Sequence, residues 1–175
     1  NCHVPQTEEG KAEAKRLMLT RDQIISPRFG APVIAPEEDG VSAPFALTLP
    51  QTELSKEEAM QLLYNMGITD IPKPDKGKNY SGRLIFSQII PKDLTIEFES
   101  YTGKVLKGLG VENRLTEKVV IKDGQLLSGI IDANALSVGK GKLVDKIARE
   151  YPSEVIEKFY HGINRIMSYM LTAKV

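Results

Sequence analysis

The chain has 175 residues, of which 41% are hydrophobic and 26% charged, a composition typical of globular rather than disordered proteins. Its 23 basic and 23 acidic residues cancel, which argues against a free-standing nucleic-acid-binding protein, since such proteins usually carry a basic excess. The balance does not exclude a module that lines a channel in a larger basic assembly. One domain, or one and a half, is expected from the length.

The single cysteine, Cys2, excludes an internal disulfide and fits a reducing cytosol. We expect it to behave as a small buried hydrophobe rather than as a nucleophile. No apolar run reaches the roughly 18–20 residues needed to span a bilayer, and no signal peptide is recognisable. The absence of an initiator methionine suits an excised or processed segment.

Residues 1–6 alternate in polarity, with Cys2 and Val4 on one side. This period of two predicts a strand with one apolar face. Thr7 is a good helix N-cap, and the two acids after it suit the positive end of the helix dipole. The helix should end near Leu19. Its packed side is expected to contain Ala14, Leu17 and Met18.

Between Ile24 and Pro50 the chain is rich in proline and glycine. These residues disfavour a helix and leave short strands at residues 24–25 and 33–34. The order of elements across the first 48 residues nevertheless ends in a second helix, close to Thr48. Both alternatives stay open at this point.

A capping box at residues 55–58 begins a helix whose apolar residues recur at helical spacing until Gly67 ends it. Residues 71–79 combine two prolines with several lysines and glycines, which predicts a loop. Residues 84–90 and 94–98, which are separated by Pro-Lys-Asp, are predicted to be strands.

Residues 118–131 predict a β-hairpin, because a central Asp-Gly pair supplies the positive φ angles of a tight turn. An amphipathic helix is expected at residues 142–151. A final helix follows Pro152, and we interpret its apolar stripe as core packing rather than a membrane or partner surface. Strands in the middle with helices at both ends indicate an α+β fold.

Four features invite a functional interpretation, and each has a simpler one. The acids at residues 37–39 suggest a metal, yet adjacent acids in a Pro/Gly loop are usually solvated. Residues 138–142, Val-Gly-Lys-Gly-Lys, lack the spacing of a phosphate loop, which indicates a glycine-rich turn before a helix. The basic stretch from Lys73 to Arg83 contains Tyr80; it suits phosphate contact with base stacking, or an exposed loop. His161 is interpreted as a surface or hydrogen-bonded histidine.

The first block, Asn-Cys-His-Val-Pro-Gln-Thr-Glu-Glu at residues 1–9 with Ile-Ser-Pro-Arg-Phe-Gly-Ala-Pro-Val-Ile at residues 25–34, resembles a known family. It is similar to the stretch after the metal-binding loop in the largest subunit of multisubunit DNA-directed RNA polymerases, in its archaeal and eukaryotic form. The family motif there reads D-F-D-G-D-x-M-N-x-H-V-P-Q. The chain begins at its Asn, so the resemblance implies that the magnesium-binding aspartates precede Asn1.

Four further blocks match the same family in order. Residues 62–68 with 71–74 resemble its x-L-L-x-x-x-G-I helix and Pro-rich linker, and residues 82–94 resemble G-K-Q-I-F-S-x-x-x-P-x-x-L, with departures at Arg83 and Leu84. Residues 119–129 match the hairpin V-V-I-x-D-G-x-L-x-x-G, and residues 150–154 are similar to E-Y-G-P-E. Each block alone is weak, whereas the ordered set is specific.

The resemblance implies that residues 1–50 are the tail of the catalytic barrel domain with its connection, and that residues 51–175 are the pore domain. Its function would be to shape the floor of the active centre and the pore through which nucleotides enter and backtracked RNA leaves, in transcription within the cytoplasm. Implied partners are the other polymerase subunits, template DNA, the RNA transcript, nucleoside triphosphates and transcript-cleavage factors, with no membrane. Magnesium would serve the parent enzyme, a nucleotidyltransferase, while this chain alone would bind none and be inactive. The alternative is a free-standing α+β protein-interaction domain without a nucleic-acid role.

No catalytic or metal-binding residue is assigned to the chain itself. The candidates for contact with nucleotide or RNA are Asn1, His3, Gln6, Arg83, Lys140 and Lys142. For His3 a hydrogen-bonded structural role is an equal alternative. Where relatives often have a Lys-Lys pair, this chain has Ala133 and Asn134, which weakens any electrostatic guidance there. The lysines at 140 and 142 are the expected substitutes.

Overall fold

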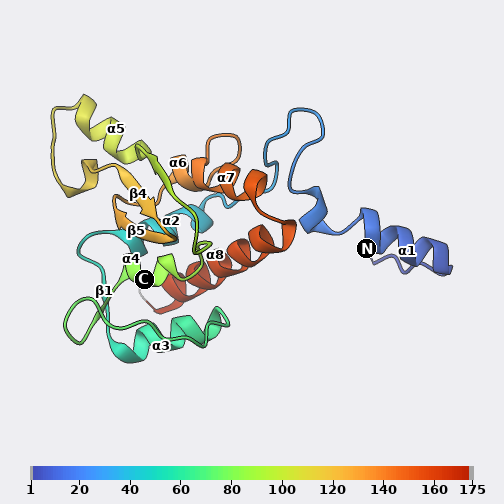
Figure 1. Ribbon diagram of the computed structural model, residues 1–175, viewed down its shortest axis with the longest axis horizontal. Helices are drawn as coiled ribbons and strands as arrows, with labels where there is room; N and C mark the ends of the chain where they lie inside the picture. Colours follow the sequence, from blue (N-terminus) through green and yellow to red (C-terminus); the bar gives the residue numbers. More distant parts are fainter. Residues whose placement is uncertain (1, 174–175) are drawn as a thin grey trace.

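The computed structural model describes residues 2–173 and shows an α+β fold (Figure 1). The α-helices are α1 (Glu8–Leu17), α2 (Asp39–Thr48), α3 (Lys56–Asn65), α4 (Gly82–Ser87), α5 (Tyr101–Gly108), α6 (Ala133–Leu136), α7 (Lys142–Glu150) and α8 (Ser153–Ala173). The 3₁₀ helices are η1 (Thr20–Gln23) and η2 (Arg114–Thr116). The strands are β1 (Glu53–Leu54), β2 (Tyr80–Ser81), β3 (Ile96–Phe98), β4 (Val119–Lys122) and β5 (Gln125–Ser128).

Helix α8 is the centre of the packing. Helices α2, α3 and α7 and the 3₁₀ helix η1 all contact it, and its buried apolar residues recur on one side, as the stripe in the sequence predicted. Phe159 of α8 meets Phe86 of α4 edge to face, with ring centroids 6.4 Å apart and an interplanar angle of 86°. The interpretation of the stripe as core is confirmed, and none of the helices within residues 2–173 is long and apolar enough to cross a membrane.

Two small antiparallel sheets flank this helical centre. Strands β1 and β2 form one, and the order β3-β4-β5 forms the other. The predicted hairpin is confirmed: β4 and β5 are joined by Asp123 and Gly124, with φ angles of 48° and 72°. Two positive φ values in succession match the twist of the strands that they connect.

Helix α3 also forms as predicted. Ser55 accepts a hydrogen bond from the backbone of Glu58, whose carboxylate accepts one from Ser55 N–H, completing the capping box. Gly67 lies just beyond the helix end with a φ of 74°, a conformation that glycine adopts without strain. The segment at residues 71–79 is a loop, as expected.

The N-terminal strand prediction is wrong for residues 2–6, which form no strand and are all exposed. Their apolar side chains lack a facing strand within the described chain, so the period of two has nothing to pair with. Asn1 lies outside the described residues. Helix α1 begins after the Thr7 cap as predicted, but it buries none of its residues, so the expected packed side is wrong as well. Figure 1 shows α1 as an arm that extends from the body, and Cys2, in the segment that precedes α1, is exposed rather than buried.

The proline-rich segment contains a helix, which corrects the expectation of none between Ile24 and Pro50. A single bridge between Ile25 and Pro32 replaces the two short strands. Helix α2 includes Pro44, whose missing N–H is tolerated because burial against α4 and α8 compensates for the lost bond. The alternative with a helix near Thr48 is the one confirmed.

The strand predicted at residues 84–90 is instead helix α4 followed by a turn. Ser81 caps it by accepting the Leu84 N–H at 3.2 Å, and the apolar residues are buried against α2 and β5 rather than on a sheet face. The strand at residues 94–98 is confirmed in its second part as β3. Helices α7 and α8 lie where the sequence indicates, whereas α5 and α6 were not predicted.

Candidate functional site

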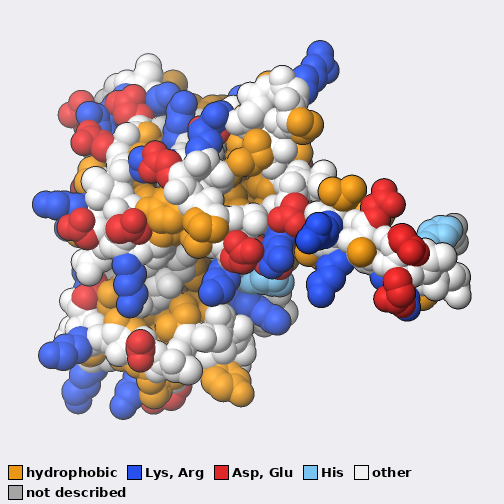
Figure 2. Space-filling model, turned by 45° about the vertical axis from the view of Figure 1, so that its right-hand side comes forward, with side chains coloured by type: hydrophobic (Ala, Val, Ile, Leu, Met, Phe, Trp, Pro, Cys, Tyr) orange, Lys and Arg blue, Asp and Glu red, His pale blue; other side chains and the backbone are white. Residues whose placement is uncertain are grey.

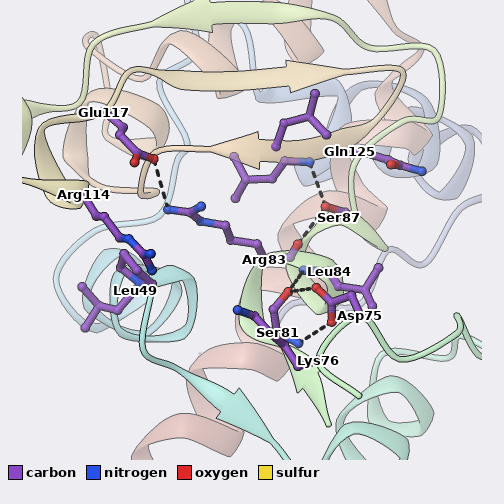
Figure 3. Close-up of a pocket in the computed structure, with 13 residues that line it drawn as sticks. Leu49, Asp75, Lys76, Ser81, Arg83, Leu84, Ser87, Arg114, Glu117 and Gln125 are labelled. Atoms are coloured by element: carbon purple, nitrogen blue, oxygen red, sulfur yellow. Dashed lines mark hydrogen bonds and ion pairs between the residues drawn. The ribbon is translucent and has the colours of Figure 1, made fainter. Parts of the chain in front are cut away.

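A cavity lies where α4 faces the β4–β5 hairpin, with η2 and the end of α2 closing its sides. Its volume is about 530 Å³, within the range of small-ligand sites. Figure 3 shows Arg83 and Arg114 on one side of this cleft and Asp75 with Ser81 on the other. The cleft is lined by Leu49, Pro50, Asp75, Lys76, Ser81, Arg83, Leu84, Ser87, Arg114, Glu117, Gln125, Leu126 and Leu127.

Gly82 fixes the start of α4 against the end of α2. A Cβ atom at this position would lie 1.8 Å from the backbone oxygen of Leu47, so only glycine permits this approach. The Gly82 N–H also donates to the Thr52 oxygen at 3.3 Å. The close contact therefore sets the position of the next residue, Arg83, at the floor of the cleft.

Ser87 joins α4 to the hairpin through one hydroxyl. Its Oγ donates to the Arg83 backbone oxygen at 2.7 Å and accepts from the Leu126 N–H at 2.9 Å. The contact is buried, and a hydroxyl that satisfies both groups removes the penalty of an unpaired strand N–H. The two walls of the cleft are thus held at a fixed separation.

Arg83 is the most buried charge of the cleft, with 21% of its side chain exposed. Its Nη2 lies 3.9 Å from Glu117 Oε2, which is an ion pair but too long for a hydrogen bond. Burial lowers the pKa of Arg83, Glu117 opposes that shift, and the like charge of Arg114 adds to it. An arginine nevertheless keeps its charge at neutral pH, so the cleft floor is cationic.

The acid opposite Arg83 is already engaged. Asp75 accepts the Ser81 N–H at 2.7 Å and also its hydroxyl, which orders the loop before α4. Lys76 extends into the same cavity. Neither Asp75 nor Ser87 was singled out from the sequence, since the contacts that give them a role depend on the fold.

The predicted site residues are not brought together. His3 and Gln6 are exposed on the N-terminal arm, where the Gln6 side chain donates to the Val4 oxygen at 3.1 Å, and Asn1 is outside the described residues. Lys140 and Lys142 line a separate cavity of about 180 Å³, to which Arg149 in the last turn of α7 also contributes. Of the described candidates, only Arg83 lines the cleft at α4.

The structure decides several functional interpretations of the sequence. Base stacking by Tyr80 is wrong, because its ring is 3% exposed within the core. His161 is exposed on α8, which confirms the surface interpretation. Among residues 2–173 no group of three or more His, Cys, Asp and Glu side chains is placed to hold a metal ion, so these residues do not fit the magnesium site of a polymerase.

Asn134, at one of the two positions where a Lys-Lys pair is replaced in this chain, has a structural contact. Its side chain donates to the Glu99 backbone oxygen at 3.1 Å, and its N–H donates to the Asp132 carboxylate at 3.0 Å. The other oxygen of Asp132 accepts the Thr102 N–H at 2.9 Å. This corner ties α5 to α6 in place of presenting two cations.

Comparison with known proteins identifies the family. Residues 23–174 match the family described as RNA polymerase Rpb1, domain 3. The chain belongs to the Rpb1 domain 3 family.

Curated relatives of this Rpb1 domain 3 chain carry the name DNA-directed RNA polymerase subunit Rpo1N. The protein of Methanothermobacter thermautotrophicus strain Delta H is 37% identical over 168 residues, covering 95% of this chain and 19% of its own length. The protein of Thermococcus celer is 37% identical over 99% of this chain and 22% of its own length. The protein of Methanocaldococcus jannaschii is 39% identical over 95% of this chain and 13% of its own length. The chain thus spans about a fifth of the relatives that it matches.

Proposed function

We propose that this chain is a segment of the largest subunit of an archaeal-type DNA-directed RNA polymerase and that it serves DNA-templated RNA synthesis. The observation that carries the proposal is the colinear similarity to Rpo1N subunits across almost the whole chain. An α+β interaction domain without a nucleic-acid role is not favoured, because such a domain would not explain identity spread over 95% of the residues.

Within the enzyme, the segment's role is architectural. Residues 1–50 would connect the catalytic barrel to residues 51–175, which form the pore domain. Burial of α2 against α4 and α8 supports a rigid connection between these parts. The pore domain would border the route by which nucleoside triphosphates enter and backtracked RNA leaves, with Arg83, Lys140 and Lys142 as its cations.

The chemistry itself is assigned to atoms outside the 175 residues. In nucleotidyl transfer, magnesium ions clamp the attacking and leaving oxygens. We propose acids of the parent subunit as their ligands, since the described residues do not form such a site. The proposed partners are the other polymerase subunits, template DNA, the transcript and transcript-cleavage factors, and the proposed location is the cytoplasm.

The coding sequence upstream of Asn1 tests the assignment directly. It should encode Asp-Phe-Asp-Gly-Asp shortly before the Asn codon, and a different sequence there would overturn the proposal. The purified chain is expected to extend no RNA primer with magnesium and nucleoside triphosphates. Extension by the chain alone would show that the division of roles is wrong.

A further inference from the structure

The cleft at α4 contains a cation whose hydrogen-bonding capacity is not used. The Nε and Nη2 atoms of Arg83 are buried and donate no hydrogen bond to any residue in the range 2–173. Glu117 balances the charge from 3.9 Å without accepting a proton from either atom. A buried donor that lacks an acceptor is unfavourable by about 1–3 kcal/mol, and an arginine fork pairs best with a planar or tetrahedral oxyanion.

Arg114 lies beside it in the same cleft (Figure 3). No ion pair or hydrogen bond involves its guanidinium within the described part of the chain. Burial is the main cause of the lowered pKa of Arg83, and the like charge of Arg114 adds to it. Two guanidinium groups that face one cavity repel each other, and an anion between them removes the repulsion.

The acids of the cleft do not supply that anion. Both oxygens of Asp75 are taken by Ser81, one by its N–H and one by its hydroxyl. Glu117 stands at the rim with 43% of its side chain exposed, where solvent weakens its attraction. With Lys76 as a third cation, the interior of the cleft stays positive although the whole chain is neutral.

We propose that this cleft is a phosphate-binding site, in which one phosphate group of a nucleotide bridges Arg83 and Arg114. Its volume of about 530 Å³ accommodates a group larger than a single carboxylate. The residues that line it include no aromatic side chain, so no ring is present on which a base can stack. The site therefore recognises phosphate irrespective of the base.

The geometry of the cleft alone supports phosphate binding. That the phosphate belongs to a nucleotide rests on the proposed function. A free nucleoside triphosphate and the backbone of single-stranded RNA carry the same chemistry. An acidic segment of a protein partner is the competing occupant. It is less favoured because a peptide carboxylate offers two oxygens where the two guanidinium groups can engage three.

The test is isothermal titration calorimetry, in which inorganic tripolyphosphate is added to the 175-residue chain at low ionic strength without magnesium. Binding is expected at one site and should weaken with added salt, because exposed charges are screened. Arg114→Gln should lower the affinity about tenfold, the loss of one charge-assisted contact. Arg83→Gln should do at least as much. The Arg83 variant could lose the fold because Arg83 is largely buried. The Arg114 variant then still tests the site, because Arg114 is exposed and its replacement leaves the fold intact.

Two further variants separate a phosphate site from general basicity. Arg165→Gln is the matched control, because Arg165 is an exposed arginine of α8 that lines neither this cleft nor the cavity of Lys140 and Lys142. Its affinity for tripolyphosphate should equal that of the unaltered chain. Glu117→Gln removes the competing acid and should tighten binding roughly two- to fivefold. The proposal would be overturned if Arg165→Gln and Arg114→Gln lost the same affinity for tripolyphosphate, or if Glu117→Gln bound it more weakly.

Competition experiments against tripolyphosphate identify the molecule that supplies the phosphate. The four nucleoside triphosphates should displace tripolyphosphate equally, and a preference for one base would contradict the site as described. A short single-stranded RNA without a terminal phosphate distinguishes backbone binding, in which it competes, from binding of free nucleotides, in which it does not. Binding of a glutamate-rich peptide but not of tripolyphosphate would refute the phosphate site in favour of a protein partner. If tripolyphosphate binds while the upstream reading frame lacks the aspartates, the site stands and the polymerase assignment fails.

Discussion

Gly82 offers the sharpest test of how the cleft is built. In Gly82→Ala the added methyl group would lie 1.8 Å from the Leu47 oxygen and 2.8 Å from its carbonyl carbon. Both atoms belong to the backbone, so no side chain can move aside, and α4 must separate from α2. Overpacking of this kind costs about 1–3 kcal/mol. We expect the upper end, which corresponds to a fall in Tm of roughly 6–12 °C for a chain of this size.

Gly108→Ala is the matched control. Gly108 is also a helical glycine, at the end of α5, but an added Cβ there would have no atom within 4 Å. That variant should gain about 0.5–1 kcal/mol, because alanine loses less backbone entropy on folding. Urea unfolding followed by far-ultraviolet circular dichroism gives both values. If the two variants had equal stability, the close approach of α4 to α2 would be refuted.

Three further predictions concern the stability of the fold and the exposure of its N-terminal arm. Ser87→Ala should destabilise the chain by about 1–3 kcal/mol, since a buried strand N–H loses its acceptor; unchanged urea unfolding would contradict the bridge between α4 and β5. Tyr160→Phe should cost about 1 kcal/mol, because its hydroxyl donates to the Ile34 oxygen. Burial raises the pKa of Tyr160 above its ordinary 10.0, so wild-type stability should fall as pH rises past 10.0 more steeply than that of Tyr160→Phe. Amide exchange should be fast over residues 2–17 and slow over residues 119–128, and equal protection of both would be incompatible with the exposed arm.

Local signals predicted those elements whose shape is decided by neighbouring residues. The Asp-Gly turn of the hairpin and the capping box at residues 55–58 are complete within a few positions, so both formed as expected. The strand prediction for residues 84–90 failed because Leu84, Ile85 and Phe86 are apolar at consecutive positions, a pattern that suits a buried strand and a buried helix equally. The Ser81 cap and the contact of Gly82 with α2 decided between them.

The packing of distant segments could not be predicted from the sequence. Pro44 looked like a helix breaker, yet burial outweighs its missing hydrogen bond. The apolar residues of α1 looked like a packed face, and none of them is buried. The sequence identified Arg83 as a candidate but missed Arg114, which is 31 positions away and reaches the cleft only because η2 lies beside the hairpin.

The exposed arm has a practical consequence. Cys2 is the single cysteine among the 175 residues, and its side chain is exposed on the arm that extends from the body in Figure 2. A maleimide dye would therefore attach at one defined place, with no second thiol to react and no residue of the core disturbed. The native sequence already supports fluorescence anisotropy or single-molecule imaging without an engineered label.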